Sequence, residues 1–302
     1  MSPPAGRVRI DADLVRRLVA VQFPAWADLP VAPVVPGGHD NRTFRLGEAM
    51  LARLPSAERY AAQVEKEQRW LPRLAPALPL PIPAPLAVGA AGEGYPWPWS
   101  VLRWLPGETA AARPPADLVR FARETAGFLA ALQGIDAAGG PTAGPHSFWR
   151  GGPLATYDAE ARAAIAALAG DVDAHAALRL WDAAREAHCD DAPVWLHGDV
   201  AAGNLLVDAV GRLSAVIDFG CCAVGDPACD LVLAWTLFDA PSRAAFREAL
   251  PLDGACWARA AGWVLWKAAL IVAGDPRRDP AEYARQRRAL AGLLAGGQAT
   301  GS

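Results

Sequence analysis

Residues 195–230 contain three polar side chains whose types and spacing suit phosphoryl transfer. Asp199 follows His-Gly, Asn204 comes five positions later, and Asp218 stands within Ile-Asp-Phe-Gly. A carboxylate can align an acceptor hydroxyl and take its proton, while hard oxygen donors hold Mg²⁺ against the donor phosphates. The pattern therefore predicts Asp199 as the catalytic residue and Asn204 and Asp218 as metal ligands.

The elements around these side chains must bring them together. Two short apolar stretches, Leu205–Val207 and Leu213–Ile217, flank a polar Asp208–Arg212 turn. Alternation of apolar runs with a turn of this length is typical of a β-hairpin. We therefore expect a catalytic loop, a hairpin, and Asp218 at the exit of the hairpin.

Composition excludes several classes of protein. The chain has 302 residues, 53% of them hydrophobic, and a net charge of −3, so it is globular and shows no global attraction to nucleic acid. Its five cysteines form no CxxC pair, which favours reduced thiols in the cytoplasm. The N-terminal residues are too charged for a signal peptide, and the apolar stretch Ala260–Ala273 is short and carries Lys267, so we expect no membrane span.

The first hundred residues read as a small antiparallel lobe with one inserted helix. The helix is expected over Ala57–Leu74. Alternating apolar positions and turn residues predict five strands, at Val31–Val35, Arg42–Leu46, Met50–Leu54, Leu86–Val88 and Trp97–Arg103. We place this lobe at residues 1–104.

A glycine-rich turn in this lobe is a candidate phosphate-binding loop. Glycine, Asp and Asn tolerate unusual backbone angles and can expose amide N–H groups to an anion. The candidates are Gly37, Gly38, His39, Asp40 and Asn41. An ordinary hairpin turn is the alternative.

A cation and a glutamate follow this turn. Arg53 ends the third strand and Glu67 lies on the following helix. Such a pair can position the phosphates of a nucleotide, although a solvated charged surface is the usual role of such residues.

After residue 104 the pattern changes to helices, which predicts a larger, mainly helical lobe at residues 105–302. Helical spacing of apolar residues and Asp caps predict helices at Asp117–Gln133, Asp158–Leu168, Asp173–His188, Asp230–Phe238, Ser242–Leu250, Cys256–Ala273 and Pro280–Leu294.

The motifs HGDVAAGN and IDFG together resemble those of the aminoglycoside phosphotransferase family. The resemblance covers nearly the whole chain. It implies an α+β, bilobal, protein-kinase-like fold, with a small antiparallel β lobe and a larger helical lobe. By the same resemblance, Arg53 stands where the family has its ATP-binding Lys, and Glu67 stands where its helix partner falls. The segment containing Arg103 and Leu105 matches the hinge whose backbone holds adenine.

Two positions depart from kinase patterns. Arg53 replaces the Lys. Its guanidinium is larger than an ammonium group, so it either contacts phosphate or is displaced, in which case its ion pair with Glu67 would be lost. Ala201 stands where protein kinases acting on Ser or Thr carry a Lys. This absence resembles the small-molecule branch and argues against a protein substrate.

The resemblance implies transfer of the γ-phosphate of ATP or GTP, with Mg²⁺, to a hydroxyl of a small molecule, for example an aminoglycoside or macrolide antibiotic. A cationic aminoglycoside would need acidic residues near the acceptor site, for which Asp226, Asp239 and Asp253 are available. The alternative is a non-catalytic, pseudokinase-like nucleotide-binding module. The sequence does not predict the oligomeric state.

Overall fold

The structure is a computed structural model that describes residues 8–298 except Pro36, His39 and Asp190. The proposed phosphate-loop residue His39 therefore lies outside the described residues. The chain forms two compact units. The first contains the residues up to Pro106 together with Ala215–Gly220, and the second contains Gly107–Ser214 and the residues from Cys221 onward. Our sequence-based boundary after residue 104 placed Asp218 in the second lobe, whereas the structure groups it with the first unit.

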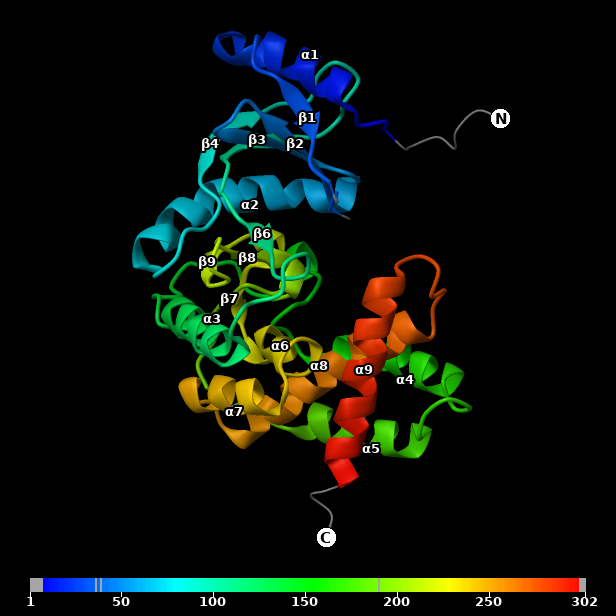
Figure 1. Ribbon diagram of the computed structural model, residues 1–302. Helices are drawn as coiled ribbons and strands as arrows, with labels where there is room; N and C mark the ends of the chain where they lie inside the picture. Colours follow the sequence, from blue (N-terminus) through cyan, green and yellow to red (C-terminus); the bar gives the residue numbers. More distant parts are fainter. Residues whose placement is uncertain (1–7, 36, 39, 190, 299–302) are drawn as a thin grey trace, which may run out of the picture. The chain divides into compact units, whose positions relative to one another are not determined.

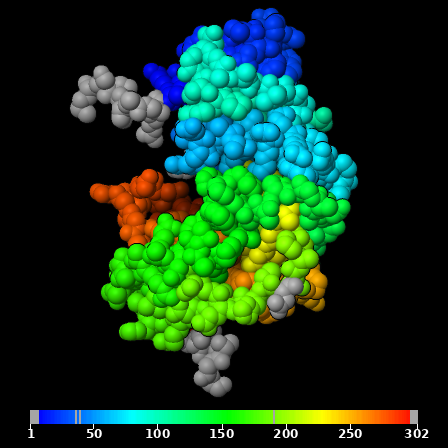
Figure 2. Space-filling model, turned by 180° about the vertical axis from the view of Figure 1, so that it is seen from behind, coloured from blue at the N-terminus to red at the C-terminus, as the bar shows by residue number. Residues whose placement is uncertain are grey.

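The first unit contains a five-stranded antiparallel sheet with two helices. The strand order is β1-β2-β3-β5-β4. The elements are α1 (Ala12–Gln22), β1 (Val31–Pro33), β2 (Asn41–Leu46), β3 (Met50–Pro55), α2 (Glu58–Leu74), β4 (Pro85–Gly89) and β5 (Trp99–Arg103). The five predicted strands and the inserted helix are present. Figure 2 shows the residues of this unit, coloured blue to cyan, gathered in one body.

Side-chain alternation along β3 determines which residues enter the core of this unit. Ala52 and Leu54 are fully buried in a cluster that also contains Leu14 and Leu18 of α1. Because successive strand residues point to opposite faces, Arg53 points to the other face of the sheet. Figure 1 shows α1 and α2 on opposite sides of the sheet, so Arg53 faces α2. The fold therefore presents a cation to a helix that carries Glu67.

The second unit is mainly helical. Its helices are α3 (Leu118–Gln133), α4 (Asp158–Ala167), α5 (Ala174–Glu186), α6 (Leu233–Thr236), α7 (Ala240–Ala249), α8 (Gly254–Val272) and α9 (Pro280–Gln298). Aspartates cap four of them, because their carboxylates accept backbone N–H groups of the first helical turn. The capping residues are Asp117, Asp173, Asp239 and Asp253. The α+β fold class is thus confirmed.

Short strands of this unit hold the catalytic loop. They are β6 (Glu108–Thr109), β7 (Val194–Leu196), β8 (Leu205–Val207), β9 (Leu213–Val216) and β10 (Ala223–Gly225). The order β6-β8-β9 includes the predicted hairpin, and β7 pairs with β10. We did not predict β6, β7 or β10, because strands of two or three residues are too short to show alternation. We predicted one helix at Asp230–Phe238. The first residues of this segment belong instead to a 3₁₀ helix, Pro227–Val232, and only α6 is an α-helix.

Helix α8 is longer than the apolar stretch that we judged too short for a membrane. It spans 19 residues and is apolar enough to cross a bilayer by length and composition. Of its most apolar 18-residue window, 67% is buried inside the fold, as in a core helix.

The core position of Leu54 gives a test of the first unit. Leu54→Ala removes a fully buried side chain from β3, whereas Leu86→Ala removes one on β4 that is 42% exposed. We expect Leu54→Ala to lower the free energy of unfolding by about 2–5 kcal/mol, because it leaves a cavity. Leu86→Ala should change it by no more than about 0.5 kcal/mol. Urea denaturation measures both, and equal losses would contradict the assigned packing.

Candidate active site

The loop before β8 is held by a buried carboxylate. Asp230 is fully buried and accepts the backbone N–H groups of His197 and Gly198, at 2.7 Å each. Gly198 has φ +85°, and a Cβ there would lie 2.4 Å from the carbonyl oxygen of Cys221. The Asp199 N–H donates to Nδ1 of His197 at 3.2 Å, so His197 braces the backbone. The loop therefore presents Asp199 from a fixed backbone.

The Asp199 carboxylate has two close polar neighbours and remains 37% exposed. Asn204 Nδ2 donates to the Asp199 carbonyl at 2.9 Å and to its Oδ2 at 3.3 Å. Lys267 Nζ lies 3.4 Å from Asp199 Oδ1. The side chain is thus oriented by an amide and an ammonium, with part of its surface left for another molecule.

The charges around Asp199 keep it ionised. Burial alone would raise the pKa of Asp199. The positive charges of Lys267 and Arg150 outweigh burial and hold this pKa below its ordinary value. An ionised carboxylate is the form that can take a proton from a hydroxyl group.

Asn204 suits the predicted role of metal ligand. Because its Nδ2 is committed to Asp199, its Oδ1 faces away and makes no hydrogen bond within the described part of the chain. An amide oxygen that makes no hydrogen bond can serve as a ligand for Mg²⁺. Asp218, which belongs to the first unit, supplies a carboxylate, a second type of hard oxygen ligand that Mg²⁺ accepts. No cluster of three or more His, Cys, Asp or Glu side chains that could hold a metal occurs among the described residues.

In the first unit, Arg53 joins two carboxylates. Its Nη1 donates to Glu67 Oε1 at 2.6 Å, and its Nη2 contacts Asp218 Oδ1. The structure therefore forms the Arg53–Glu67 pair despite the Lys-to-Arg departure. Burial raises the pKa of Glu67, although the guanidinium opposes this. Asp218 has a left-handed backbone, with φ +66°, which is uncommon outside glycine and frequent at functional sites.

The other nucleotide-site candidates lie in the same unit. Asn41 is buried at the start of β2, and in the orientation that satisfies both amide atoms its oxygen accepts from Arg53 Nη2 at 2.9 Å. The Gly38 carbonyl accepts from Arg42 at 2.7 Å, and the Asp40 carbonyl accepts from the Ser56 N–H at 2.8 Å. Gly37 is exposed in the turn between β1 and β2. Asn41 thus hydrogen-bonds to the guanidinium of Arg53, whereas Gly37, Gly38 and Asp40 belong to the turn.

The predicted hinge follows β5. The Arg103 N–H donates to the Ala84 carbonyl at 2.9 Å, and the Trp104 N–H donates to the Ala49 carbonyl at 2.8 Å. The N–H of Leu105 makes no hydrogen bond among residues that the structure describes. It is therefore available as the donor that a purine edge requires.

The sequence analysis missed two lysines at these motifs. The 302-residue chain contains only two, Lys66 and Lys267. Lys66 of α2 is buried and donates to the carbonyl of Gly220, directly after Asp218-Phe219, at 2.7 Å. Lys267 of α8 contacts Asp199. The low lysine content was the available signal, but composition alone predicts no position or role.

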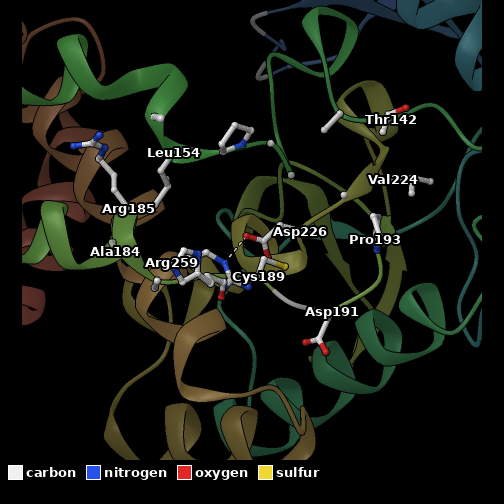
Figure 3. Close-up of a pocket in the computed structure, with 18 residues that line it drawn as sticks. Thr142, Leu154, Ala184, Arg185, Cys189, Asp191, Pro193, Val224, Asp226 and Arg259 are labelled. Atoms are coloured by element: carbon white, nitrogen blue, oxygen red, sulfur yellow. Dashed lines mark hydrogen bonds and ion pairs between the residues drawn. The ribbon is translucent and has the colours of Figure 1, made fainter.

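Two cavities lie in the second unit. A small one of about 50 Å³ is lined by the residues that follow Asp199, Val200–Gly203, with Thr236 and Lys267. A larger one of about 480 Å³ contains none of the residues predicted as catalytic, metal-binding or nucleotide-binding, but its lining includes Asp226, which we expected near a cationic acceptor. Figure 3 shows Asp226 and Arg259 in its wall, joined by an ion pair with Nε–Oδ2 at 2.6 Å. The smaller cavity is therefore the one that borders the catalytic loop.

The contact between Lys267 and Asp199 predicts a change in pH dependence. Lys267→Met removes an ammonium that stabilises the carboxylate, so the pKa of Asp199 should rise. The base would then stay protonated up to a higher pH, and the acid limb of the pH profile of phosphoryl transfer should move upward. Lys267→Arg keeps the charge and serves as the control. An acid limb that stays in place in Lys267→Met would contradict the assigned role.

Comparison with known proteins gives these observations a context. The sequence pattern of the phosphotransferase enzyme family matches residues 31–263. The GDP complex of wild-type aminoglycoside 2'-phosphotransferase-IIIa has a TM-score of 0.69 at 18% identity, covering 95% of this chain and 99% of that chain. Macrolide 2'-phosphotransferase MphH from Brachybacterium faecium has a TM-score of 0.57 at 23% identity, covering 94% and 97%. Comparison with curated proteins gave no match.

The structural similarities confirm the expected kinase-like fold. The family pattern spans well over half of the 302 residues and includes Arg53, Asp199, Asn204 and Asp218. The protein therefore belongs to the phosphotransferase enzyme family.

Proposed function

We propose that this protein transfers the γ-phosphoryl group of Mg²⁺-bound ATP or GTP to a hydroxyl group of a small molecule. The observation that carries the proposal is the ionised, partly exposed Asp199 carboxylate on a braced loop. Family membership supports the reaction class.

The reaction assigns a distinct task to each residue. The acceptor oxygen forms a bond to the γ-phosphorus while the bond to the oxygen bridging the β- and γ-phosphorus breaks, and the nucleoside diphosphate leaves. Asp199 Oδ aligns the acceptor hydroxyl and receives its proton. Asn204 Oδ1 and the Asp218 carboxylate would hold Mg²⁺, which neutralises charge on the phosphates when bound.

The nucleotide donor is assigned to the first unit. The Leu105 N–H would meet the purine edge, and the turn at Gly37, Gly38 and Asp40 would cover the phosphates. Structures similar in fold include a GDP complex of aminoglycoside 2'-phosphotransferase-IIIa and a streptomycin–ATP complex of APH(2")-IIa, which support both the donor and a small-molecule acceptor. Ala201, in place of the protein-kinase lysine, argues against a protein acceptor.

The role of Asp199 is tested by Asp199→Asn. The amide cannot take the proton, so kcat should fall by about 10²–10⁴-fold while Mg·ATP and Mg·GTP still raise the melting temperature. Asp171→Asn, an exposed substitution outside the site, should leave kcat unchanged. Near-normal turnover by Asp199→Asn would refute the assignment. Nucleotide binding by the unsubstituted protein, without any hydrolysis or transfer, would favour the non-catalytic module.

The role of Arg53 needs a design that separates stability from nucleotide binding. Arg53→Ala leaves Glu67 buried without its partner, which should cost about 3–5 kcal/mol of stability. Adding Glu67→Gln removes the orphaned charge and should restore much of that loss. We expect the nucleotide KM to stay high in the double variant and to rise less in Arg53→Lys. A double variant with normal nucleotide KM would limit Arg53 to a structural role.

A further inference from the structure

One guanidinium beside the catalytic loop lacks a carboxylate partner. The Arg150 guanidinium lies 4.6 Å from the ring centroid of Trp266 and 5.4 Å from that of Trp263. It forms no ion pair with any carboxylate in the described part of the chain. A guanidinium stacked on an indole keeps its N–H edge free, and that edge matches a carboxylate or a phosphate.

The segment that carries Arg150 is held in an unusual conformation. Phe148 and Trp149 have φ of +49° and +56°, a left-handed region that L-residues rarely adopt. The Tyr157 hydroxyl donates to the Phe148 carbonyl, and the Asp226 N–H donates to the Gly151 carbonyl at 2.8 Å. Strain of this kind persists only where surrounding contacts enforce it. The guanidinium is thus pre-organised.

Arg150 stacks on the turn of α8 that also carries Lys267. Trp266, on which it stacks, directly precedes Lys267, whose Nζ lies 3.4 Å from Asp199 Oδ1. Arg150 is also close enough to Asp199 to help lower its pKa. Two cations therefore flank the catalytic carboxylate, and only Lys267 is paired with it.

The acidic residues that could have received a cationic acceptor have other tasks. Asp226 pairs with Arg259, and Asp239 and Asp253 cap α7 and α8. Glu160 accepts the Trp266 Nε1–H at 2.8 Å. Glu282, which lines the small cavity together with Lys267, pairs with Arg285. These acidic side chains therefore all have partners within the described part of the chain and are not free to neutralise several ammonium groups.

We propose that the acceptor is an alcohol that also carries a carboxylate or phosphate group, and that Arg150 binds this group while Asp199 aligns the hydroxyl. The inference rests on the proposed phosphotransferase activity. A polycationic acceptor would instead place ammonium groups beside Arg150 and Lys267, where like charges repel each other. Arg150 would thus select the acceptor by charge.

The test compares matched acceptors that differ in charge. Gluconate and glucose 6-phosphate are anionic, glucose is neutral, and glucosamine and kanamycin are cationic. Transfer from Mg·ATP and Mg·GTP to each compound is measured against acceptor-free nucleotide hydrolysis, with binding at millimolar concentration as a second readout. We expect the anionic alcohols to give the highest kcat/KM, with a KM that rises with salt.

Variants of Arg150 show whether this residue is responsible. Arg150→Gln should raise the KM for the anionic acceptor by about tenfold or more and leave the nucleotide KM unchanged, because one charge-assisted contact is lost. Arg150→Lys should retain part of the affinity. Arg247, stacked on Trp257 at 4.6 Å, supplies the matched control, and Arg247→Gln should change neither KM. Thermal unfolding checks that each variant is folded.

Each outcome decides the proposal. Preferred transfer to glucosamine, kanamycin or glucose would overturn it while leaving the phosphotransferase activity intact, and so would the absence of binding by both anionic alcohols. If Arg150→Gln raised only the KM for the nucleotide, the guanidinium would bind the nucleotide and not the acceptor, and the proposal would again be overturned. Loss of all Asp199-dependent hydrolysis and transfer would instead be a failure of the proposed function itself.

Discussion

The contact between the Asp230 carboxylate and two backbone N–H groups supports the whole catalytic loop. A buried carboxylate that accepts two amides at 2.7 Å fixes the direction of the chain at His197 and Gly198. Burial raises the pKa of Asp230, and the hydrogen bonds from the His197 and Gly198 N–H groups oppose this effect. Asn204 adds a hydrogen bond to the Asp199 carbonyl, and the Asp199 carboxylate remains 37% exposed.

Charge is distributed differently in the two units. In the first, Arg53 satisfies two carboxylates at once, so Asp218 and Glu67 share one cation. In the second, Asp199 has two cations nearby, and one of them stacks on indole rings instead of on a carboxylate. The first arrangement suits a residue that must later release a carboxylate to a metal ion. The second suits a base that must stay ionised and a substrate that brings its own negative charge.

Much of the fold was predictable from local sequence, because long helices and six-residue strands carry periodic patterns, as in α3 and β2. Asp199, Asn204 and Asp218 could be proposed from sequence because their two motifs lie close together within residues 195–230. The neighbours that set the charge of Asp199 were not, because Lys267 and Arg150 reach it from segments more than 40 residues away in sequence. Sequence could also not decide whether Arg53 would keep Glu67, since that depends on how α2 packs on the sheet.

The two lysines have a consequence for chemical labelling. Lys66 is buried beneath the carbonyl of Gly220, whereas 31% of the Lys267 side chain is exposed. An amine-selective covalent reagent therefore has a single accessible lysine in the described chain, and that lysine contacts the proposed base. A mild electrophile would act here as a probe of one side chain, and protection of Lys267 by bound compounds would report occupancy of the acceptor site.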